Sequence, residues 1–228
     1  MEDLASKLLE ELNCETVFTI PVLGGIGVSE SVVVTWIIMA MLIIFSICMT
    51  RNLKVENPGK RQIVIETFVC GLQNIVKGCV GEEGSRYVPY LVTVIMYIGL
   101  SNIIGLLGMK PPTKDLNVTA ALAIMSIILI EYAGIHKKGT GKWLKSFTEP
   151  VAIVTPINIL ELFIRPLSLC MRLFGNVLGA FVVMELLKMI VPIAIPIPFS
   201  LYFDIFDGFI QAYVFVFLTS LFIKEAVE

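Results

Sequence analysis

Long uncharged stretches alternate with short polar loops along the first two thirds of the chain. Residues 31–50 and 87–109 contain no Asp, Glu, Lys or Arg. A third apolar stretch follows Pro112 and carries one carboxylate, Glu131, near its end. About 20 apolar residues in an α-helix cross the hydrocarbon core of a bilayer. We therefore predict membrane-spanning helices over residues 29–50, 86–109 and 116–135.

Residues 60–81 follow a different pattern, in which Lys, Glu, Gln and Asn are mixed with Ile, Val and Phe. This weak amphipathicity favours a helix lying in the membrane interface. A helix in a soluble loop is the alternative. Residues 1–28 are expected outside the membrane. Residues 1–15 are acidic and lack the basic beginning of a cleaved signal peptide, so we do not interpret them as a targeting sequence. We predict a short amphipathic helix there.

The last third is apolar but repeatedly charged. Residues 150–188 are 39 positions, which as a helix would extend about 58 Å against a hydrocarbon core of about 30 Å. One upright span cannot hold that length, so the segment must tilt strongly or break. The proline-rich residues 191–198 form the connection to a final helix at 199–224. The sequence thus predicts an all-α integral membrane protein with about five membrane-embedded helices and one interfacial helix, in a single domain over 1–228.

Composition supports this class of protein. Hydrophobic residues make up 57% of the chain, whereas soluble domains are about 45–50% apolar. A net charge of −2 without a basic run gives no reason to expect nucleic acid as a partner. The single histidine, His136, excludes a multi-histidine metal site within the chain, and the five cysteines lack metal-ligand spacing. We therefore expect no cofactor and no metal, and read the cysteines as reduced packing residues.

Basic residues in the loops predict the orientation of the chain. Nine of them fall on one side of the predicted spans and three on the other. By the positive-inside rule, the N-terminus lies outside and the C-terminus in the cytoplasm. The nine are Arg51, Lys54, Lys60, Arg61, Lys137, Lys138, Lys142, Lys145 and Lys224, and the three are Lys7, Lys110 and Lys114.

Charged residues are concentrated in the last two predicted helices. A charge near the bilayer centre costs about 2.5–3.5 kcal/mol on insertion scales, and such groups commonly mark an ion path. At about 100° per residue, one narrow stripe of a helix collects the polar positions of the first of these helices. That stripe consists of Glu161, Arg165, Arg172, Asn176 and Gly179.

A second polar stripe is predicted in the final helix. Asp204, Asp207 and Gln211 are spaced i, i+3 and i+7, which places them on one face. The two stripes could meet in an ion path, or form buried salt bridges that only hold two helices together. Glu161 and Arg165 could equally neutralise one another as an i, i+4 pair.

Three sequence segments resemble subunit a of F-type ATP synthases. They are PPTKDLNVTAALA at residues 111–123, PLSLCMRLFGN at 166–176 and DGFIQAYVFVFLT at 207–219. They occur in the order of that family, and together the resemblance covers most of the chain.

The resemblance implies a fold, a function and partners. The last two helices are expected to be long, strongly tilted and paired as a hairpin beside a rotor, with Arg172 opposite the rotor ring. The implied role is that of a non-catalytic stator subunit whose two aqueous half-channels load and unload the carboxylates of the ring, so that flow of H⁺ or Na⁺ drives rotation and ATP synthesis. The implied partners are the ring of c subunits, peripheral-stalk subunit b and the lipid bilayer of a bacterial inner membrane.

Individual positions follow the family unevenly. Asn176 and Gln211 match family positions near the arginine and are carried over as polar lining. The position nine residues after the arginine is often acidic in the family but is Phe181 here, and Asp204 stands where histidine or an acid is common. We expect Asp204 to supply the missing carboxylate in the outer half-channel, with Asp207 and Glu185 as further acids. Lys188 is expected to extend to the membrane surface.

Three other classes of protein fit the sequence less well. A small secondary transporter with a midplane site would normally show two related halves, and none are seen. An intramembrane protease would need a nucleophile–base or metal pair, which the sequence does not offer. A purely structural subunit would leave Arg172 unexplained.

Overall fold

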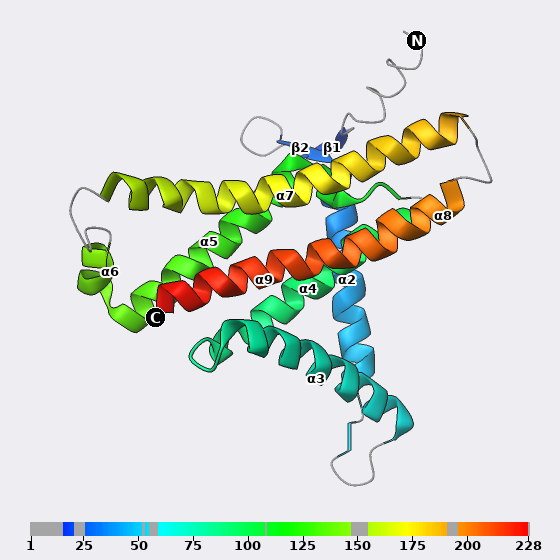
Figure 1. The fold of residues 1–228 in the computed structure, drawn as a ribbon. Coiled ribbons are helices and arrows are strands. Elements are labelled where there is room, and N and C mark those ends of the chain that lie inside the picture. Colours follow the sequence, from blue (N-terminus) through cyan, green and yellow to red (C-terminus); the bar gives the residue numbers. More distant parts are fainter. Residues whose placement is uncertain are drawn as a thin grey trace.

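The computed structural model describes residues 16–20, 26–51, 53–54, 59–107, 109–146, 155–190 and 196–227. This part of the chain is mostly helical (Figure 1). Six stretches of it are long and apolar enough to cross a membrane, which confirms the predicted all-α integral membrane fold. The main helices are α2 (Glu30–Thr50), α3 (Lys60–Val80), α4 (Val88–Ile103), α5 (Leu116–Lys138), α7 (Thr155–Ile190) and α9 (Gly208–Val227).

Shorter elements connect these helices. They are the 3-10 turns η1 (Ser85–Tyr87), η2 (Ile104–Leu107) and η3 (Pro112–Lys114), the helices α6 (Thr140–Ser146) and α8 (Pro196–Ser200), and the π-helical segment η5 (Leu201–Asp207). Strands β1 (Thr16–Ile20) and β2 (Ile26–Ser29) form an antiparallel pair before α2. This strand pair, within the segment expected outside the membrane, was not predicted from the sequence. The amphipathic helix predicted at residues 1–15 lies outside the described residues.

Local chemistry sets several helix limits. The side chain of Asp115 accepts a hydrogen bond of 2.9 Å from the backbone N–H of Asn117, which caps the start of α5. At the other end of α5, Gly139 has a φ of 80°, a left-handed conformation that costs glycine little. α3 ends in the same way at Gly81, with a φ of 81°.

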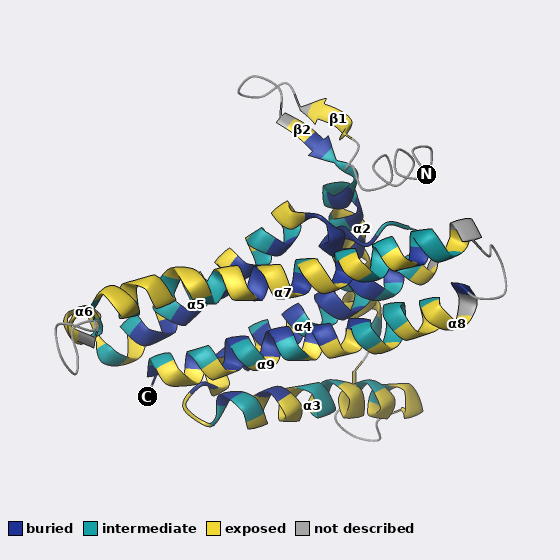
Figure 2. Cartoon of the chain, turned by 45° about the horizontal axis from the view of Figure 1, so that its top comes forward, coloured by how far each residue is buried: buried dark blue, intermediate teal, exposed yellow. Residues whose placement is uncertain are grey.

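The core lies where α4, α5, α7 and α9 meet. α4 packs against α9, and α5 packs against both α7 and α9. The fully buried side chains there are Leu91, Ile98, Ile130, Leu169, Leu173 and Ile223. Large apolar residues remain exposed along the outward faces of α2, α3 and α7. The exposed faces of α3 and α7 are yellow in Figure 2. Such surfaces would be a liability in water but suit a lipid environment.

The last two long helices form an antiparallel pair. α7 and α9 run side by side across the molecule, steeply inclined to α2 (Figure 1). α7 is one helix of 36 residues with Pro166 inside it, about 54 Å long at 1.5 Å per residue. Of the two predicted alternatives, a tilted helix and a broken one, α7 is therefore the continuous helix. At this length it can lie within a hydrocarbon core of about 30 Å only if it is strongly tilted.

The final helix and α3 differ from the sequence prediction or leave it untested. The final helix, predicted as one element at 199–224, is divided into α8, η5 and α9, because the backbone widens to a π-helix over Leu201–Asp207. α3 is also long and apolar enough to cross a membrane. Its interfacial placement therefore stays a prediction.

Candidate functional site

Arg172 lies on the outward face of α7. Leu169, Leu173 and Val177 are buried on the side of this helix that packs against α5, whereas Arg172 and Asn176 are exposed. Among the described residues, none forms an ion pair or hydrogen bond with the Arg172 side chain. Arginine keeps its proton in proteins. This face of α7 therefore presents a permanent, uncompensated positive charge.

The neighbouring arginine behaves differently. Arg165 contacts Glu161 at 3.0 Å and Glu225 of α9 at 2.7 Å, and its guanidinium carbon lies 5.0 Å from the centroid of the Phe222 ring. Its side chain is only 15% exposed. The predicted Glu161–Arg165 pair is therefore present, and Glu225 is a second partner that sequence reasoning missed.

The predicted acidic residues of the final helix lie in its π-helical part. Ser200 Oγ donates a hydrogen bond of 2.6 Å to Asp204 Oδ2. The Asp204 carboxylate also lies against η2, the turn that follows α4, since a methyl group placed on Gly105 would be 3.0 Å from Asp204 Oδ1. Asp204 is thus held between two elements of the fold.

A buried amide supports the junction between this segment and α9. Asn102 Nδ2 donates to the backbone carbonyl of Gly208 at 3.1 Å, and Thr113 Oγ1 donates to Asn102 Oδ1 at 2.9 Å. Sequence reasoning did not single out Asn102. The signal was there, since Asn102 is an amide within a stretch free of charge.

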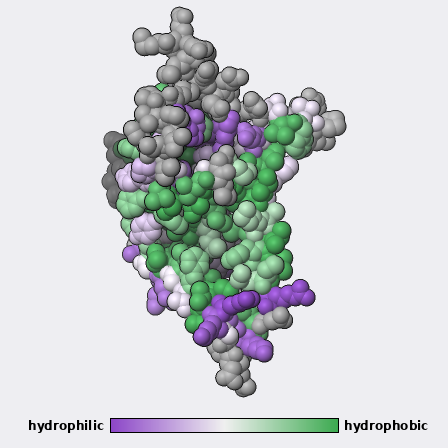
Figure 3. Space-filling view, turned by 90° about the vertical axis from the view of Figure 1, so that its right-hand side faces the viewer, coloured by the Kyte–Doolittle hydropathy of each residue, from purple (hydrophilic) through white to green (hydrophobic). Residues whose placement is uncertain are grey.

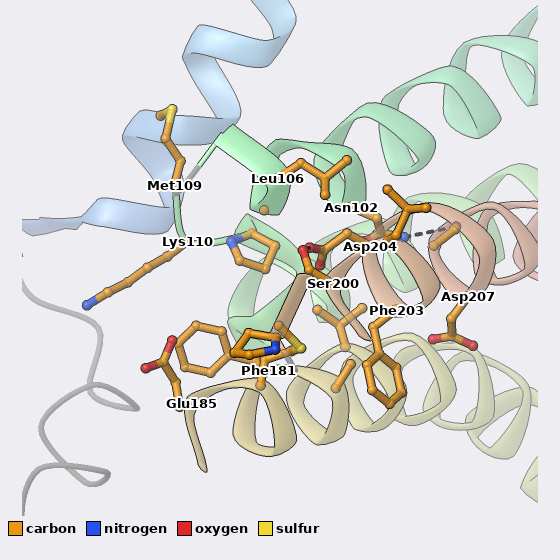
Figure 4. A pocket seen from close by; sticks show the side chains of 18 of the residues that line it. Asn102, Leu106, Met109, Lys110, Phe181, Glu185, Ser200, Phe203, Asp204 and Asp207 are labelled. Atoms are coloured by element: carbon orange, nitrogen blue, oxygen red, sulfur yellow. Dashed lines mark hydrogen bonds between the residues drawn. The ribbon is translucent and has the colours of Figure 1, made fainter. Parts of the chain in front are cut away.

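The acidic residues line a cleft of about 680 Å³ between α7, η5 and the end of α4 (Figure 4). Asp204 and Ser200 converge in this Asp204 cleft, and Asp207 lies beyond Phe203. Glu185 lines it as well and forms an ion pair of 2.8 Å with Lys188. The structure therefore brings Glu185, Lys188, Asp204 and Asp207 to one cleft. Arg172 and Asn176 of the first predicted stripe do not line it.

Phe181 also lines the Asp204 cleft, at the position where an acid was expected from the resemblance. Its ring faces a cation, because Lys114 Nζ lies 4.5 Å from the ring centroid. Lys114 is buried to 5% exposure. An aromatic face attracts an ammonium group at this distance.

A second, smaller cleft of about 230 Å³ surrounds Arg165. Besides Arg165 it is lined by polar side chains from four helices, α5, α6, α7 and α9, namely Glu131, Lys138, Trp143, Asn158, Glu161 and Glu225. Trp143 Nε1 donates a hydrogen bond of 2.9 Å to Glu131 Oε2. We call this the Arg165 cleft.

The two clefts lie on opposite sides of Arg172 along α7. Arg165 precedes Arg172 by seven residues and Val177, which lines the Asp204 cleft, follows it by five. These separations are about 10 Å and 7.5 Å along the helix axis. The Asp204 cleft includes Lys110, which pairs with Glu30 at the start of α2 at 3.8 Å. The Arg165 cleft includes Glu225, close to the C-terminus, so the clefts reach opposite ends of the helix bundle.

Gln211 is placed less favourably than predicted. Its side chain is 8% exposed and lines neither cleft. Within the described chain it makes no hydrogen bond to Arg172. In the same residues, no group of three or more His, Cys, Asp or Glu side chains is arranged to hold a metal ion.

Comparison with known proteins identifies the family. A family model described as "ATP synthase A chain" matches residues 32–224. The chain belongs to the ATP synthase subunit a family. It is 37% identical over 207 residues to ATP synthase subunit a of Moorella thermoacetica, covering 90% of this chain and 94% of that relative. It is 35% identical over 207 residues to ATP synthase subunit a of Geotalea daltonii, covering 89% of each chain.

A third relative, ATP synthase subunit a 3 of Pelobacter propionicus, is 37% identical over 205 residues, with 88% of each chain covered. Family membership and the apolar helices place the chain in the membrane sector of an ATP synthase, in a bacterial cell membrane. The resemblance stated from the three sequence segments is thereby confirmed.

Proposed function

We propose that this member of the subunit a family is the ion-translocating stator of an F-type ATP synthase, with Arg172 as the fixed charge between two half-channels. The observation that carries the proposal is the position of Arg172. It is a cation without an ionic partner in the described chain, on an exposed helix face, between two polar clefts that lie toward opposite ends of α7.

The mechanism follows from the charge. A rotor subunit that brings a carboxylic acid to the Arg172 face meets a permanent cation, which favours the ionised form of that acid and release of its ion. The ion leaves through one cleft, and the next ring site is loaded from the other. A cation passing directly between the clefts would have to pass the guanidinium, which repels it. Each charge that crosses is worth about 2.3 kcal/mol per 100 mV, and this energy turns the ring.

The acids of the Asp204 cleft form the outer half-channel in this proposal. Asp204 supplies the carboxylate that Phe181 does not, and its hydrogen bond with Ser200 fixes its orientation. Glu185 and Asp207 line the same space. The Arg165 cleft, with Glu161 and Glu225, forms the inner vestibule. Asn176, exposed one turn from Arg172, and Gln211, buried in α9, contribute hydrogen-bonding groups near the transfer point.

The proposal extends to the assembly and to the orientation of the chain. The ring of c subunits faces the exposed Arg172 side of α7, while peripheral-stalk subunit b and lipid occupy other faces. The N-terminus is outside and the C-terminus cytoplasmic. The subunit itself is non-catalytic, and its cargo is H⁺ or Na⁺.

The test is ATP-driven ion pumping in inverted membrane vesicles that contain the whole complex. Arg172→Ala is expected to abolish pumping while the complex still assembles, and Lys142→Ala, an exposed cation of α6, serves as the matched control. Unchanged pumping in Arg172→Ala would refute the proposal. Pumping by the unaltered complex with and without sodium then identifies the ion.

A further inference from the structure

An apolar groove of about 530 Å³ lies between α2, α3, α4 and α9, away from both polar clefts. Its walls include Met41 and Phe45 of α2 and Phe68 of α3, all exposed. Gly99 of α4 also lines the groove and fills none of it, because glycine has no side chain. A methyl group placed there would make an ordinary contact of 3.8 Å with the Phe209 ring. Its volume falls within the roughly 300–1,000 Å³ of small-molecule sites.

Water is a poor occupant for this groove. A bound water needs two to four polar partners, roughly, and the lining holds no charged side chain. The lining residues are Met41, Leu42, Phe45, Phe68, Leu72, Ile95, Met96, Gly99, Leu100, Ile103, Phe209 and Tyr213. Since α2, α3, α4 and α9 are all long and apolar enough to cross a membrane, the chemistry of the groove suits a hydrocarbon chain.

Four cations gather at the end of α2 and the start of α3. They are Arg51, Lys54, Lys60 and Arg61, and all four are exposed. The loop is held against α3, because the Gln62 side chain bonds both the backbone N–H and the carbonyl of Lys54, at 3.0 and 2.9 Å. The one carboxylate nearby in the described chain, Glu66, accepts a hydrogen bond of 2.7 Å from Gln62. In Figure 3, hydrophilic side chains lie directly below a broad apolar surface.

The cations lie about the depth of a headgroup layer from the groove. Arg51 follows Phe45 by six residues and Arg61 precedes Phe68 by seven, which correspond to about 9 Å and 10 Å along each helix. The headgroup layer of a bilayer is about 5–8 Å thick on each side of the core. A phosphate at the cations would therefore place the start of an acyl chain at the groove.

We propose that the groove and the four cations form a binding site for one anionic phospholipid, with an acyl chain along the groove and its phosphate at the cations. The charge favours an anionic headgroup over a zwitterionic one, since clusters of four or more Lys and Arg residues directly after a membrane-spanning helix attract anionic lipids. This site is separate from the ion path and does not depend on it. A lipid held there would fasten α2 and α3 to the α4–α9 pair.

The experiment uses the purified intact complex, incubated with phosphatidylglycerol that carries a photoreactive group in its acyl chain. Crosslinks are expected in the peptides that contain Met41–Phe45 and Phe68–Leu72. Unlabelled phosphatidylglycerol should compete at a concentration at least about tenfold lower than phosphatidylcholine does. The double variant Lys60→Gln, Arg61→Gln should lose most of this labelling, and Lys138→Gln, Lys142→Gln, in the other basic loop, should keep it.

A second variant separates the chain from the headgroup. Gly99→Leu, which fills the groove, should reduce crosslinking while the four cations remain. Equal competition by both lipids, or labelling spread evenly over the exposed faces of α7 and α9, would show ordinary surrounding lipid and overturn the proposal. Crosslinks on another subunit in place of these peptides would overturn it as well, because a partner helix would then fill the groove.

Discussion

Arg165 on α7 donates a hydrogen bond of 2.7 Å to Glu225 on α9, 60 residues later in the chain. The same guanidinium contacts Glu161 and the Phe222 ring. One side chain thus connects α7 to α9 at the end of the hairpin opposite α8. Because its charge is shared between two carboxylates, Arg165 is suited to hold α7 and α9 in register and leaves Arg172 as the free cation of α7.

We expect Glu225→Gln to weaken this attachment slightly. Both carboxylates are about half exposed, at 49% and 58% of their side-chain surface, so each ion pair contributes about 0.2–1 kcal/mol. The temperature at which the subunit leaves the detergent-solubilised complex should fall by a few degrees. Pumping per assembled complex should be retained. Glu83→Gln, which breaks the exposed Lys137–Glu83 pair of 3.3 Å, is the control and should change less. Lost pumping in a fully assembled Glu225→Gln complex would instead place Glu225 in the ion path.

Asp204→Asn is expected to impair pumping more than Asp207→Asn. Asp204 lies in the cleft with a 2.6 Å hydrogen bond from Ser200, so it is the acid held in a fixed position. Positioned proton-transfer groups contribute roughly 10²–10⁴ to reaction rates, so removing this one should slow pumping at least about tenfold. Initial rates of ATP-driven acidification in vesicles measure the effect. Equal rates in Asp204→Asn and the unaltered complex would contradict the role given to Asp204.

Gly105→Ala tests the contact between Asp204 and η2. The added methyl group would lie 3.0 Å from Asp204 Oδ1, closer than ordinary packing, so the carboxylate must shift and its 2.6 Å hydrogen bond from Ser200 would be disturbed. We expect pumping to fall several-fold in a complex that remains assembled. The matched control is Gly99→Ala in the preceding helix α4, where the nearest atom would be 3.8 Å away. If both variants pump alike, the position of Asp204 against Gly105 has no functional weight.

Much of the fold could be predicted because local rules suffice for it. Charge-free stretches predicted the spans at residues 31–50 and 87–109, and the start of α5 has an equally local cause in its Asp115 cap. The face of α7 that carries Arg172 follows from helical periodicity alone, and the structure leaves that face exposed. Each of these depends on neighbours within about two turns of helix.

The features that were missed depend on distant parts of the chain. The π-helix at Leu201–Asp207 lies where Asp204 packs against Gly105, about 100 residues earlier, and α-helical spacing could not reveal it. It changes the facing of Asp204 and Asp207 relative to Gln211, which is one reason why Gln211 is buried while the two acids line a cleft. Glu225 was missed for the same reason, since its partner Arg165 is 60 residues away.

Gly208→Ala should loosen the packing of α4 against α9. A methyl group on Gly208 would lie 2.8 Å from Asn102 Cβ, a distance at which the two helices must move apart. The movement would also strain the 3.1 Å bond from Asn102 to the Gly208 carbonyl. Overpacking of this kind costs about 1–3 kcal/mol, so the subunit should leave the solubilised complex at a lower temperature.

Gly71→Ala in α3 is the control, because no atom lies within 4 Å of the added methyl group. Alanine has a higher helix propensity than glycine, by about 1 kcal/mol. Gly71→Ala should therefore leave the stability of the subunit unchanged or raise it. The same loss of stability in both variants would mean that the effect comes from losing a helical glycine, whereas a loss confined to Gly208→Ala identifies the close approach of α4 and α9.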